Sequence, residues 1–297
     1  PGTGWSTNPT AMQMLDRDVI FTNVALTDEG DVWWEGMTEQ VPAHLVDWQG
    51  RDWTPGCGRP AAHPNARFTV AAAQCPSIAG DLQDPQGVVV DAVLFGGRRR
   101  SNVPLVAQAP DWAGGVFVGA SVSSEQTAAA EGTVGQLRHD PFAMVPFCGY
   151  DMADYFGHWV GMGRRLSQPP AVFGVNWFRR GGDGRFLWPG FGENSRVIAW
   201  ICARLAGRVG AVSTPVGLVP AAGDLDVAGL GVPGADLAEL FAVDPVAWAA
   251  ELDELEAYFG RFGDKLPTEL SRRLHEIRDE LRAVRWEQRR WEEWTTD

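Results

Sequence analysis

The chain has 297 residues, of which 45% are apolar and 21% are charged, enough for one or two globular domains with a sizeable core. Its 38 acidic residues outnumber 25 basic ones, and the net charge of −13 excludes an electrostatic nucleic-acid binder. Only one basic residue is a lysine, Lys265, so no Schiff-base or phosphate-loop lysine precedes that position.

Cysteine use and hydropathy predict a cytoplasmic protein without a membrane anchor. The four cysteines are widely spaced, form no C-x-x-C pair and are too few for a disulfide framework, which favours a reducing compartment. No apolar run approaches the ~18 residues of a membrane span. The opening residues Pro1 to Gly4 form no signal peptide and lack an initiator methionine, so we expect the chain to begin inside a longer protein.

Tryptophan is abundant, with 14 residues scattered singly or in the pair Trp33 and Trp34. Most of these side chains are expected in the core or as platforms. The alternative is a surface row of tryptophans that binds carbohydrate.

Residues 1–86 are rich in turns and contain two strand-like runs, residues 19–26 and 31–35. The segment Asp28-Glu29-Gly30 between them predicts a hairpin. Little periodicity and much proline, glycine and aspartate at residues 36–66 favour a long ordered loop that carries a function.

Three apolar runs predict the strands of a mixed sheet, residues 87–95, 115–121 and 171–178. The first runs into Gly96-Gly97-Arg98-Arg99-Arg100, and the third reaches an arginine-flanked turn at residues 179–185. The ends of this sheet are therefore expected to present functional loops.

The second apolar run leads into a segment without bulky side chains. Residues 121–135 are expected to form a lid whose closing excludes water from a site. The alternative for its centre, residues 127–131, is a single helical turn.

Helical periodicity dominates from Asn194 onward. Asn194 or Ser195 is expected to cap a helix that Gly207 stops. Connectors follow at residues 208–233, and a C-terminal helical segment, residues 245–297, is predicted to hold helices near 245–259 and 268–294. The fold class is therefore α/β, in the mixed α+β sense, with a mixed sheet and C-terminal helices.

The arginine triplet after the first strand is a candidate anion site. Two glycines give backbone freedom, and guanidinium forks bind two oxygens of a phosphate or carboxylate at once. The alternative is a basic surface turn.

Asn65 and Arg67 form a second candidate. In an extended segment, side chains two residues apart point the same way, so an amide and a guanidinium could hold a small carboxylate together. A loop amide beside a solvated arginine is the alternative.

Phe178, Phe186 and Phe191 with Asn194 form the third candidate. Aromatic rings on a turn-rich segment can sandwich a flat base, and the amide offers a donor and an acceptor to its edge. The alternative is an aromatic hairpin that belongs to the core.

Metal and nucleophile motifs are not visible in the sequence. The five histidines have no partner at ligand spacing, so no metal ligand is predicted in this chain. No G-x-S-x-G elbow supports a serine triad.

Residues 176–197, with the string NWFRRGGDGRFLWPGFGENSRV, closely resemble the guanine-binding region of GTP-dependent phosphoenolpyruvate carboxykinases. The resemblance extends over essentially the whole chain, in the same order and spacing. The further matching segments are AHPNARF (62–68), AAQCP (72–76), FGGRR (95–99), VPLV (103–106), GVFVGASVSSEQTAAAE (115–131) and HDPFAM (139–144).

The resemblance implies roles for individual residues. Asn65, Ala66 and Arg67 match the segment that holds the carboxylate substrate, with Arg67 also near the transferred phosphoryl group. Arg98 matches an arginine on the nucleotide phosphates, so Arg67 and Arg98 are the expected catalytic residues. The matched nucleotide site is completed by the aromatic walls, the turn between them and the base-reading amide, namely Phe178, Phe186, Phe191, Gly192, Glu193 and Asn194.

The resemblance also implies a reaction, in which oxaloacetate and GTP give phosphoenolpyruvate, CO2 and GDP in gluconeogenesis. The family's phosphate loop and the lysine, histidine and aspartate that bind Mn²⁺ or Mg²⁺ find no match here and are expected upstream of Pro1. Residues 1–297 would then be an incomplete C-terminal nucleotide-binding domain of a monomeric enzyme, inactive without its N-terminal half. The alternatives are a non-catalytic guanine-nucleotide-binding fragment and, less compatible with these motifs, a carbohydrate-binding module.

Overall fold

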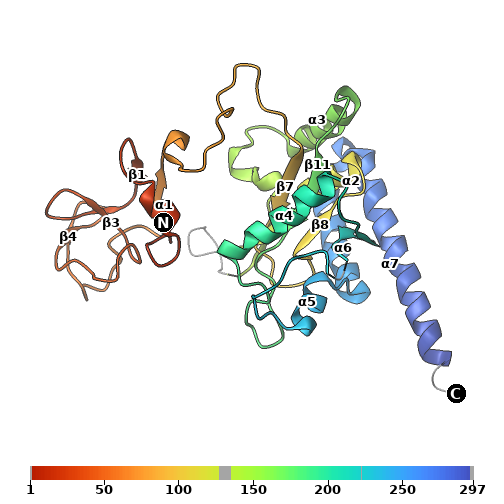
Figure 1. Ribbon diagram of the computed structural model, residues 1–297. Coiled ribbons are helices and arrows are strands. Elements are labelled where there is room, and N and C mark those ends of the chain that lie inside the picture. Colours follow the sequence, from red (N-terminus) through yellow and green to blue (C-terminus); the bar gives the residue numbers. More distant parts are fainter. Residues whose placement is uncertain (1, 127–134, 222, 295–297) are drawn as a thin grey trace. The chain divides into compact units, whose positions relative to one another are not determined.

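The computed structural model describes residues 2–126, 135–221 and 223–294, with side chains up to position 283 (Figure 1). The chain divides into two units. Unit 1 comprises Pro1–Val89 with Gln126–Val134, and unit 2 comprises Val90–Glu125 with Gly135–Asp297.

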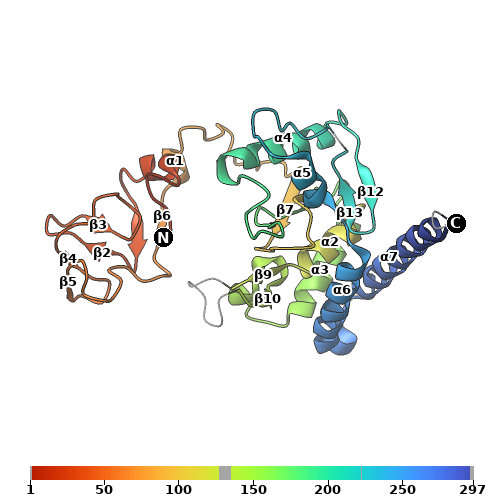
Figure 2. The same ribbon diagram turned by 90° about the horizontal axis from the view of Figure 1, so that it is seen from below.

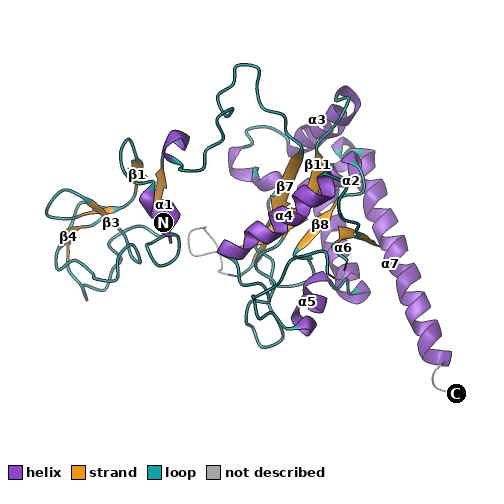
Figure 3. Ribbon diagram, in the orientation of Figure 1, coloured by secondary structure: helices purple, strands orange, loops and turns teal. Residues whose placement is uncertain are grey.

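Unit 1 is built from short antiparallel strands, which Figure 3 shows joined by long loops. One sheet has the order β3-β2-β4-β5, and a separate pair joins β1 to β6. The elements are α1 (Pro9–Gln13), β1 (Ile20–Thr22), β2 (Ala25–Leu26), β3 (Val32–Trp33), β4 (Leu45–Val46), β5 (Asp52–Trp53) and β6 (Arg67–Thr69), followed by a 3₁₀ turn at Ala72–Gln74.

The predicted hairpin in unit 1 is confirmed, since Ala25 of β2 pairs with Trp33 of β3. The single strand predicted at residues 19–26 is wrong, because Asn23 adopts a left-handed φ of 58° and separates β1 from β2. The predicted loop at residues 36–66 is also wrong in part, because it contains β4 and β5. Strands of two residues are too short to leave a periodic signal in the sequence.

Trp33 and Trp34 point to opposite sides of the strand and fill two small cores. The Trp33 ring lies 6.0 Å from that of Trp53, and the Trp34 ring lies 5.9 Å from that of Phe68. Of the tryptophans whose side chains the structure describes, only Trp5 is exposed. The expectation of core tryptophans is therefore confirmed, and the carbohydrate-binding alternative has no surface row to support it among those residues.

Unit 2 is centred on a mixed sheet of order β12-β13-β8-β11-β7, in which β7 and β11 run parallel and the other neighbours are antiparallel. A separate hairpin joins β9 to β10. The strands are β7 (Ala92–Gly96), β8 (Val106–Gln108), β9 (Ser123–Glu125), β10 (Leu137–His139), β11 (Ala171–Val175), β12 (Val212–Thr214) and β13 (Gly217–Val219). The mixed sheet with helices confirms the predicted fold class.

Helices cover both faces of this sheet, as Figure 2 shows, with α4 and α5 on one side and α2, α3, α6 and α7 on the other. Phe173 of β11 packs toward α4, while Val172 faces α2. The helices are α2 (Trp112–Ala120), α3 (Met152–Arg165), α4 (Asn194–Leu205), α5 (Gly234–Phe241), α6 (Pro245–Phe259) and α7 (Thr268–Trp294), with 3₁₀ turns at Pro141–Ala143, Val145–Phe147, Phe191–Glu193 and Gly260–Lys265.

The predicted strand at residues 115–121 is wrong, because this segment belongs to helix α2. Asp111 caps the helix by accepting a hydrogen bond from the amide of Gly114 at 2.7 Å. A Cβ on Gly115 would lie 2.5 Å from Val172, so glycine allows the helix to approach β11 closely. The helix is apolar on every side because it is buried, and this removes the period that distinguishes a helix from a strand.

Other boundaries differ in a similar way. The strand predicted at 87–95 begins only at Ala92, and Val88–Val90 before it are exposed. The strand predicted at 171–178 ends at Val175. The connectors at 208–233 contain β12 and β13, and helices α3 and α5 were not predicted.

The C-terminal helices confirm the prediction closely, since α6 and α7 span Pro245–Phe259 and Thr268–Trp294. One face of α7 is buried against α2, α3 and α6 through Leu270, Leu274, Ile277 and Leu281. No helix in the described part of the chain has the length and apolar content needed to span a membrane. The thiols of Cys57, Cys75, Cys148 and Cys202 are free.

Candidate functional site

The end of strand β7 carries the arginine triplet past two close contacts. A Cβ on Gly96 would lie 2.6 Å from the carbonyl oxygen of Val175, and one on Gly97 would lie 2.0 Å from that of Ser123. Glycine is therefore required at both positions to let the strand end pass between β11 and β9.

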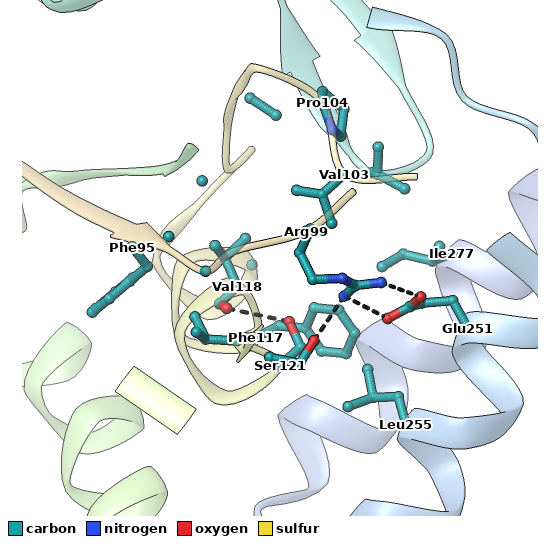
Figure 4. Close-up of a pocket in the computed structure, with 18 of the residues that line it drawn as sticks. Phe95, Arg99, Val103, Pro104, Phe117, Val118, Ser121, Glu251, Leu255 and Ile277 are labelled. Atoms are coloured by element: carbon teal, nitrogen blue, oxygen red, sulfur yellow. Dashed lines mark hydrogen bonds and ion pairs between the residues drawn. The ribbon is translucent and has the colours of Figure 1, made fainter. Parts of the chain in front are cut away.

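The three arginines that follow have different surroundings. Arg99 is buried, with 8% of its surface exposed, and donates to both carboxylate oxygens of Glu251 at 2.8 and 2.5 Å (Figure 4). It also donates to the hydroxyl of Ser123 at 2.7 Å. Arg100 pairs with Glu125 through two hydrogen bonds of 2.8 and 3.0 Å.

Arg98 alone of the three has no carboxylate within 4.0 Å among the described residues. Its guanidinium lies over the ring of Phe178, 4.1 Å from the ring centroid, and its backbone amide donates to the Ser124 hydroxyl. The basic-turn alternative thus fails for Arg99, which is buried, while Arg98 retains free donors for an anion.

The ion pair of Arg100 and Glu125 also shifts the pKa of both side chains. The hydrogen bond from Arg100 lowers the pKa of Glu125, and the same bond raises the pKa of Arg100. At neutral pH this pair is fully ionised.

The aromatic segment forms a tight hairpin beside Arg98. Arg180 and Phe186 make an antiparallel bridge, and the Arg180 guanidinium lies over the Phe186 ring at 4.0 Å. The rings of Phe178 and Phe186 meet edge to face with centroids 6.3 Å apart. Phe186 is 46% exposed, which contradicts the alternative that this hairpin is simply core.

Phe191 and Asn194 lie at the start of α4. Phe191 is 64% exposed and contacts no other aromatic ring in the described parts of the chain. It follows Gly190, whose φ of 92° requires glycine. The structure therefore brings Phe178 and Phe186 together but leaves Phe191 as a separate exposed ring.

Asn194 does not cap the helix, contrary to prediction. Helix α4 begins at Asn194 with Glu193 before it, and no side chain caps its first turn. The Asn194 side-chain oxygen instead accepts from the indole N–H of Trp188 at 2.9 Å. Glu193 pairs with Arg196 at 2.6 Å, and the Ser195 hydroxyl donates to the carbonyl of Gly192 at 2.9 Å.

Asn65 and Arg67 lie in unit 1, where their side chains meet, although Asn65 lies in a turn and not in the extended segment that the prediction assumed. The Arg67 Nε donates to the Asn65 side-chain oxygen at 2.8 Å. Ala66 between them is buried beside Trp34, and Arg67 begins β6, in register with Thr22 of β1. The backbone is thus anchored while the Arg67 side chain is exposed.

An apolar cavity of about 110 Å³ lies behind the strand end (Figure 4). It is lined by Phe95, Phe117, Val118, Leu255 and Ile277, with the Arg99–Glu251 pair at its edge. Sequence reasoning missed it, because the wall from α6 and α7 comes from residues far along the chain.

Comparison with known proteins adds the family. The model of the phosphoenolpyruvate carboxykinase C-terminal P-loop domain matches residues 1–280. The chain belongs to the GTP-dependent phosphoenolpyruvate carboxykinase family. Proteins named "Phosphoenolpyruvate carboxykinase [GTP]" from Renibacterium salmoninarum, Corynebacterium efficiens and Neocallimastix frontalis are 50%, 51% and 48% identical to it, over 95%, 96% and 96% of this chain. These matches cover 47%, 47% and 48% of the relatives, so the chain spans about half their length.

The sequence also predicts a lid at residues 121–135, and the family resemblance implies a metal centre. Of residues 121–135, Ser123–Glu125 form strand β9 rather than a loop, and residues 127–134 lie outside the described part. Within the part of the chain that the structure describes, no three His, Cys, Asp or Glu side chains come together as a metal site.

Proposed function

We propose that this chain forms the guanine-nucleotide and carboxylate-binding part of a phosphoenolpyruvate carboxykinase. The enzyme would convert oxaloacetate and GTP into phosphoenolpyruvate, CO2 and GDP in gluconeogenesis. Family membership supports the proposal, since each relative described above carries that enzyme name with GTP. The observation that carries it in the structure is the orientation of the Asn194 amide.

Asn194 would select guanine by presenting donors to the base. The Trp188 indole can only donate, so the oxygen of the Asn194 amide must face it, and the NH₂ group points away. Guanine offers the acceptors O6 and N7 on one edge, whereas adenine places a donor NH₂ group at the position of O6. Donors facing O6 therefore favour guanine and leave a donor facing a donor with adenine.

Aromatic rings would enclose the base. Phe178 and Phe186 meet edge to face, and the exposed rings of Phe186 and Phe191 have area to lose to a ligand. Gly192 and Glu193 form the turn that joins Phe191 to Asn194, so their backbone would lie beside the base edge.

Arg98 and Arg67 would act on the anionic groups. Decarboxylation of oxaloacetate leaves an enolate, and its oxygen takes the γ-phosphoryl group of GTP. Arg98 would contact the nucleotide phosphates, and Asn65, Ala66 and Arg67 would hold the substrate carboxylate. Charged donors fixed before the reaction stabilise the negative charge that develops on the transferred phosphoryl group. Arg67 and Arg98 are accordingly the proposed catalytic residues.

The remaining chemistry would come from elsewhere in the enzyme. We assign the phosphate loop and the ligands of Mn²⁺ or Mg²⁺ to the half of the relatives that this chain does not span. Residues 1–297 would form the C-terminal nucleotide-binding domain, with a lid around residues 121–135. We expect a monomeric, cytoplasmic enzyme that binds neither nucleic acid nor membrane.

Calorimetric titration of the chain with GDP and ADP tests the base-reading role. Asn194→Asp keeps an acceptor for Trp188 but replaces the NH₂ donors with an acceptor, so GDP affinity should fall by about 10- to 100-fold. ADP affinity should stay constant or rise. Asn8→Asp is the matched control, because a carboxylate caps α1 as the amide of Asn8 does. Equal losses for both nucleotides would remove Asn194 from base selection.

A turnover assay separates the enzyme from a non-catalytic nucleotide-binding protein. The complete protein, in which this chain is joined to the part its relatives have in addition, should release CO2 from oxaloacetate in the presence of GTP. Guanine-nucleotide binding without any turnover in that protein would favour the non-catalytic alternative.

A further inference from the structure

The turn that precedes the Asn65–Arg67 pair is closed by a histidine ring. The amide of Ala66 donates to the carbonyl of His63 at 2.8 Å, which closes a turn over residues 63–66. Inside this turn, the backbone amide of Asn65 donates to Nδ1 of the His63 ring at 3.0 Å. An imidazole nitrogen that accepts a hydrogen bond carries no proton, so the ring proton must be on Nε2.

The ring and the turn are also fixed from outside. The Trp48 indole meets the His63 ring edge to face, with centroids 4.6 Å apart. Asn23, in its left-handed conformation, accepts from the His63 amide at 3.0 Å and donates its side-chain amide to the carbonyl of Asn65 at 3.4 Å. Directly before the turn, the Glu35 carboxylate accepts from the amides of Ala61 and Ala62 at 2.6 and 3.3 Å.

Asn65 links the His63 ring to the guanidinium of Arg67, because it makes a hydrogen bond to each of them. The Asn65 side-chain oxygen accepts from Nε of Arg67 at 2.8 Å. This bond uses the inner donor of the fork and leaves the donors of the two terminal nitrogens of Arg67 available to a ligand. If the turn loosens at the Asn65 amide, the acceptor for Arg67 Nε moves with it.

We propose that His63, as the neutral tautomer with its proton on Nε2, is the positioning residue of the Asn65–Arg67 carboxylate site. The proposal rests on the function proposed above for Asn65 and Arg67. His63 itself contacts the backbone of the site and acts through it, because its ring nitrogen fixes the turn that holds Asn65 and leads directly into Arg67.

Steady-state kinetics of the complete enzyme test the role. His63→Phe keeps a ring against Trp48 but removes the acceptor, so the KM for oxaloacetate should rise about tenfold, the value of one well-placed hydrogen bond. The KM for GTP should stay unchanged. His63→Asn places an amide oxygen near the position of Nδ1 and should restore the KM to within about threefold of the original.

The control is His158→Phe, the same substitution at an exposed position of α3 in unit 2, which should leave both KM values unchanged. Equal impairment of His63→Phe and His63→Asn, a parallel rise in both KM values, or no change in either would overturn the positioning role.

Two further measurements distinguish a failure of the His63 role from misfolding and from a failure of the proposed function. Long-range ¹H–¹⁵N spectra of the unsubstituted chain should show the shifts of an unprotonated Nδ1 and a protonated Nε2 for His63, and the opposite tautomer would overturn it. Arg67→Ala should raise the KM for oxaloacetate. If Arg67→Ala has no effect, the substrate site proposed above is wrong. If it acts while His63→Phe does not, only the His63 role is wrong.

Discussion

Asp47 in unit 1 and Arg99 in unit 2 are buried charged groups close to a candidate site, and the two are stabilised over very different sequence distances. In unit 1, the Asp47 carboxylate is 3% exposed and accepts from the amides of Gln49 and Arg51 at 2.9 and 3.0 Å. It also accepts from Nε of Arg59 at 2.9 Å. In unit 2, Arg99 depends on Glu251, 152 positions further along the chain.

The difference shows two ways to support an exposed arginine in an acidic protein. Residues 47–61 satisfy Asp47 locally, and the amide of Trp48 donates to the carbonyl of Ala61, two residues before the His63 turn. In unit 2, the pair of Arg99 with Glu251 instead links the strand end that carries Arg98 to helix α6. Carboxylates thus pair with the supporting arginines Arg51, Arg59 and Arg99, while Arg67 and Arg98 keep donors available among the described residues.

Removing the long-range partner should have the largest effect. Glu251→Ala leaves the Arg99 guanidinium buried without a counter-ion, so the free energy of unfolding of unit 2 should fall by about 3–5 kcal/mol. Urea denaturation measures this loss. Glu254→Ala, three residues further along α6 and exposed, is the control and should change stability by less than about 0.5 kcal/mol. A similar small loss for Glu251→Ala would mean that Arg99 finds water or another partner.

The local cluster of unit 1 should show its contribution in a pH dependence. Burial by itself would raise the pKa of Asp47, but the amide of Arg51 and the guanidinium of Arg59 outweigh it and hold the pKa well below its usual range. A carboxyl whose pKa is lowered by folding stabilises the protein above its unfolded pKa of about 4 and loses that effect as the pH falls further.

Asp47→Asn should therefore lower the Tm by roughly 5 °C at pH 7. The difference in Tm between the variant and the unsubstituted chain should stay constant above about pH 5 and become smaller below about pH 4. Thermal unfolding at a series of pH values checks this, with the exposed Asp81→Asn as control. A gap that does not depend on pH would show that the charge of Asp47 is not what stabilises the cluster.

The smallest expected effect compares neighbouring arginines. Arg98→Lys removes the planar fork over Phe178, so the affinity for GDP should fall about tenfold, with a matching loss of turnover in the complete enzyme. Arg100→Lys retains a cation beside Glu125 and should change affinity less than about threefold. If both substitutions lowered the affinity for GDP equally, Arg98 would be an ordinary arginine of a basic surface turn and not a nucleotide-binding residue.

Much of the fold could be predicted wherever the chain marks its own boundaries. Helix α6 begins after Asp244, whose carboxylate accepts from the amides of Val246 and Ala247, and the predicted range was correct. Helix α2 was mistaken for a strand because burial on all sides leaves no polar face. Helix α3 was missed, although Asp151 caps it and Ala153, Phe156 and Val160 repeat at helical spacing along its buried face.

Within the candidate site, too, local contacts were easier to predict than contacts between residues far apart in the sequence. The Asn65–Arg67 contact joins residues two positions apart, so the sequence suggested that the two side chains act together, but Asn65 lies in a turn and not in the extended segment that the prediction assumed. The contact of Arg98 with Phe178 joins distant positions, and only the parallel pairing of β7 with β11 brings them together. The residues near Arg98 and Arg99 in the sequence do not show which of the two is buried in an ion pair, because the partner of Arg99, Glu251, lies 152 positions further along the chain.

The parallel pairing of β7 with β11 sets an order of events for a chain leaving the ribosome. Ala92 cannot pair with Ala171 until the latter has been synthesised, and the Arg99–Glu251 ion pair can form only later still. Contacts between residues so far apart form slowly, because a long loop has to close before they contribute. The strands of unit 1 all lie between Ile20 and Thr69, so the strand pairing that holds Arg67 can form before Arg98 and Arg99 have their distant partners.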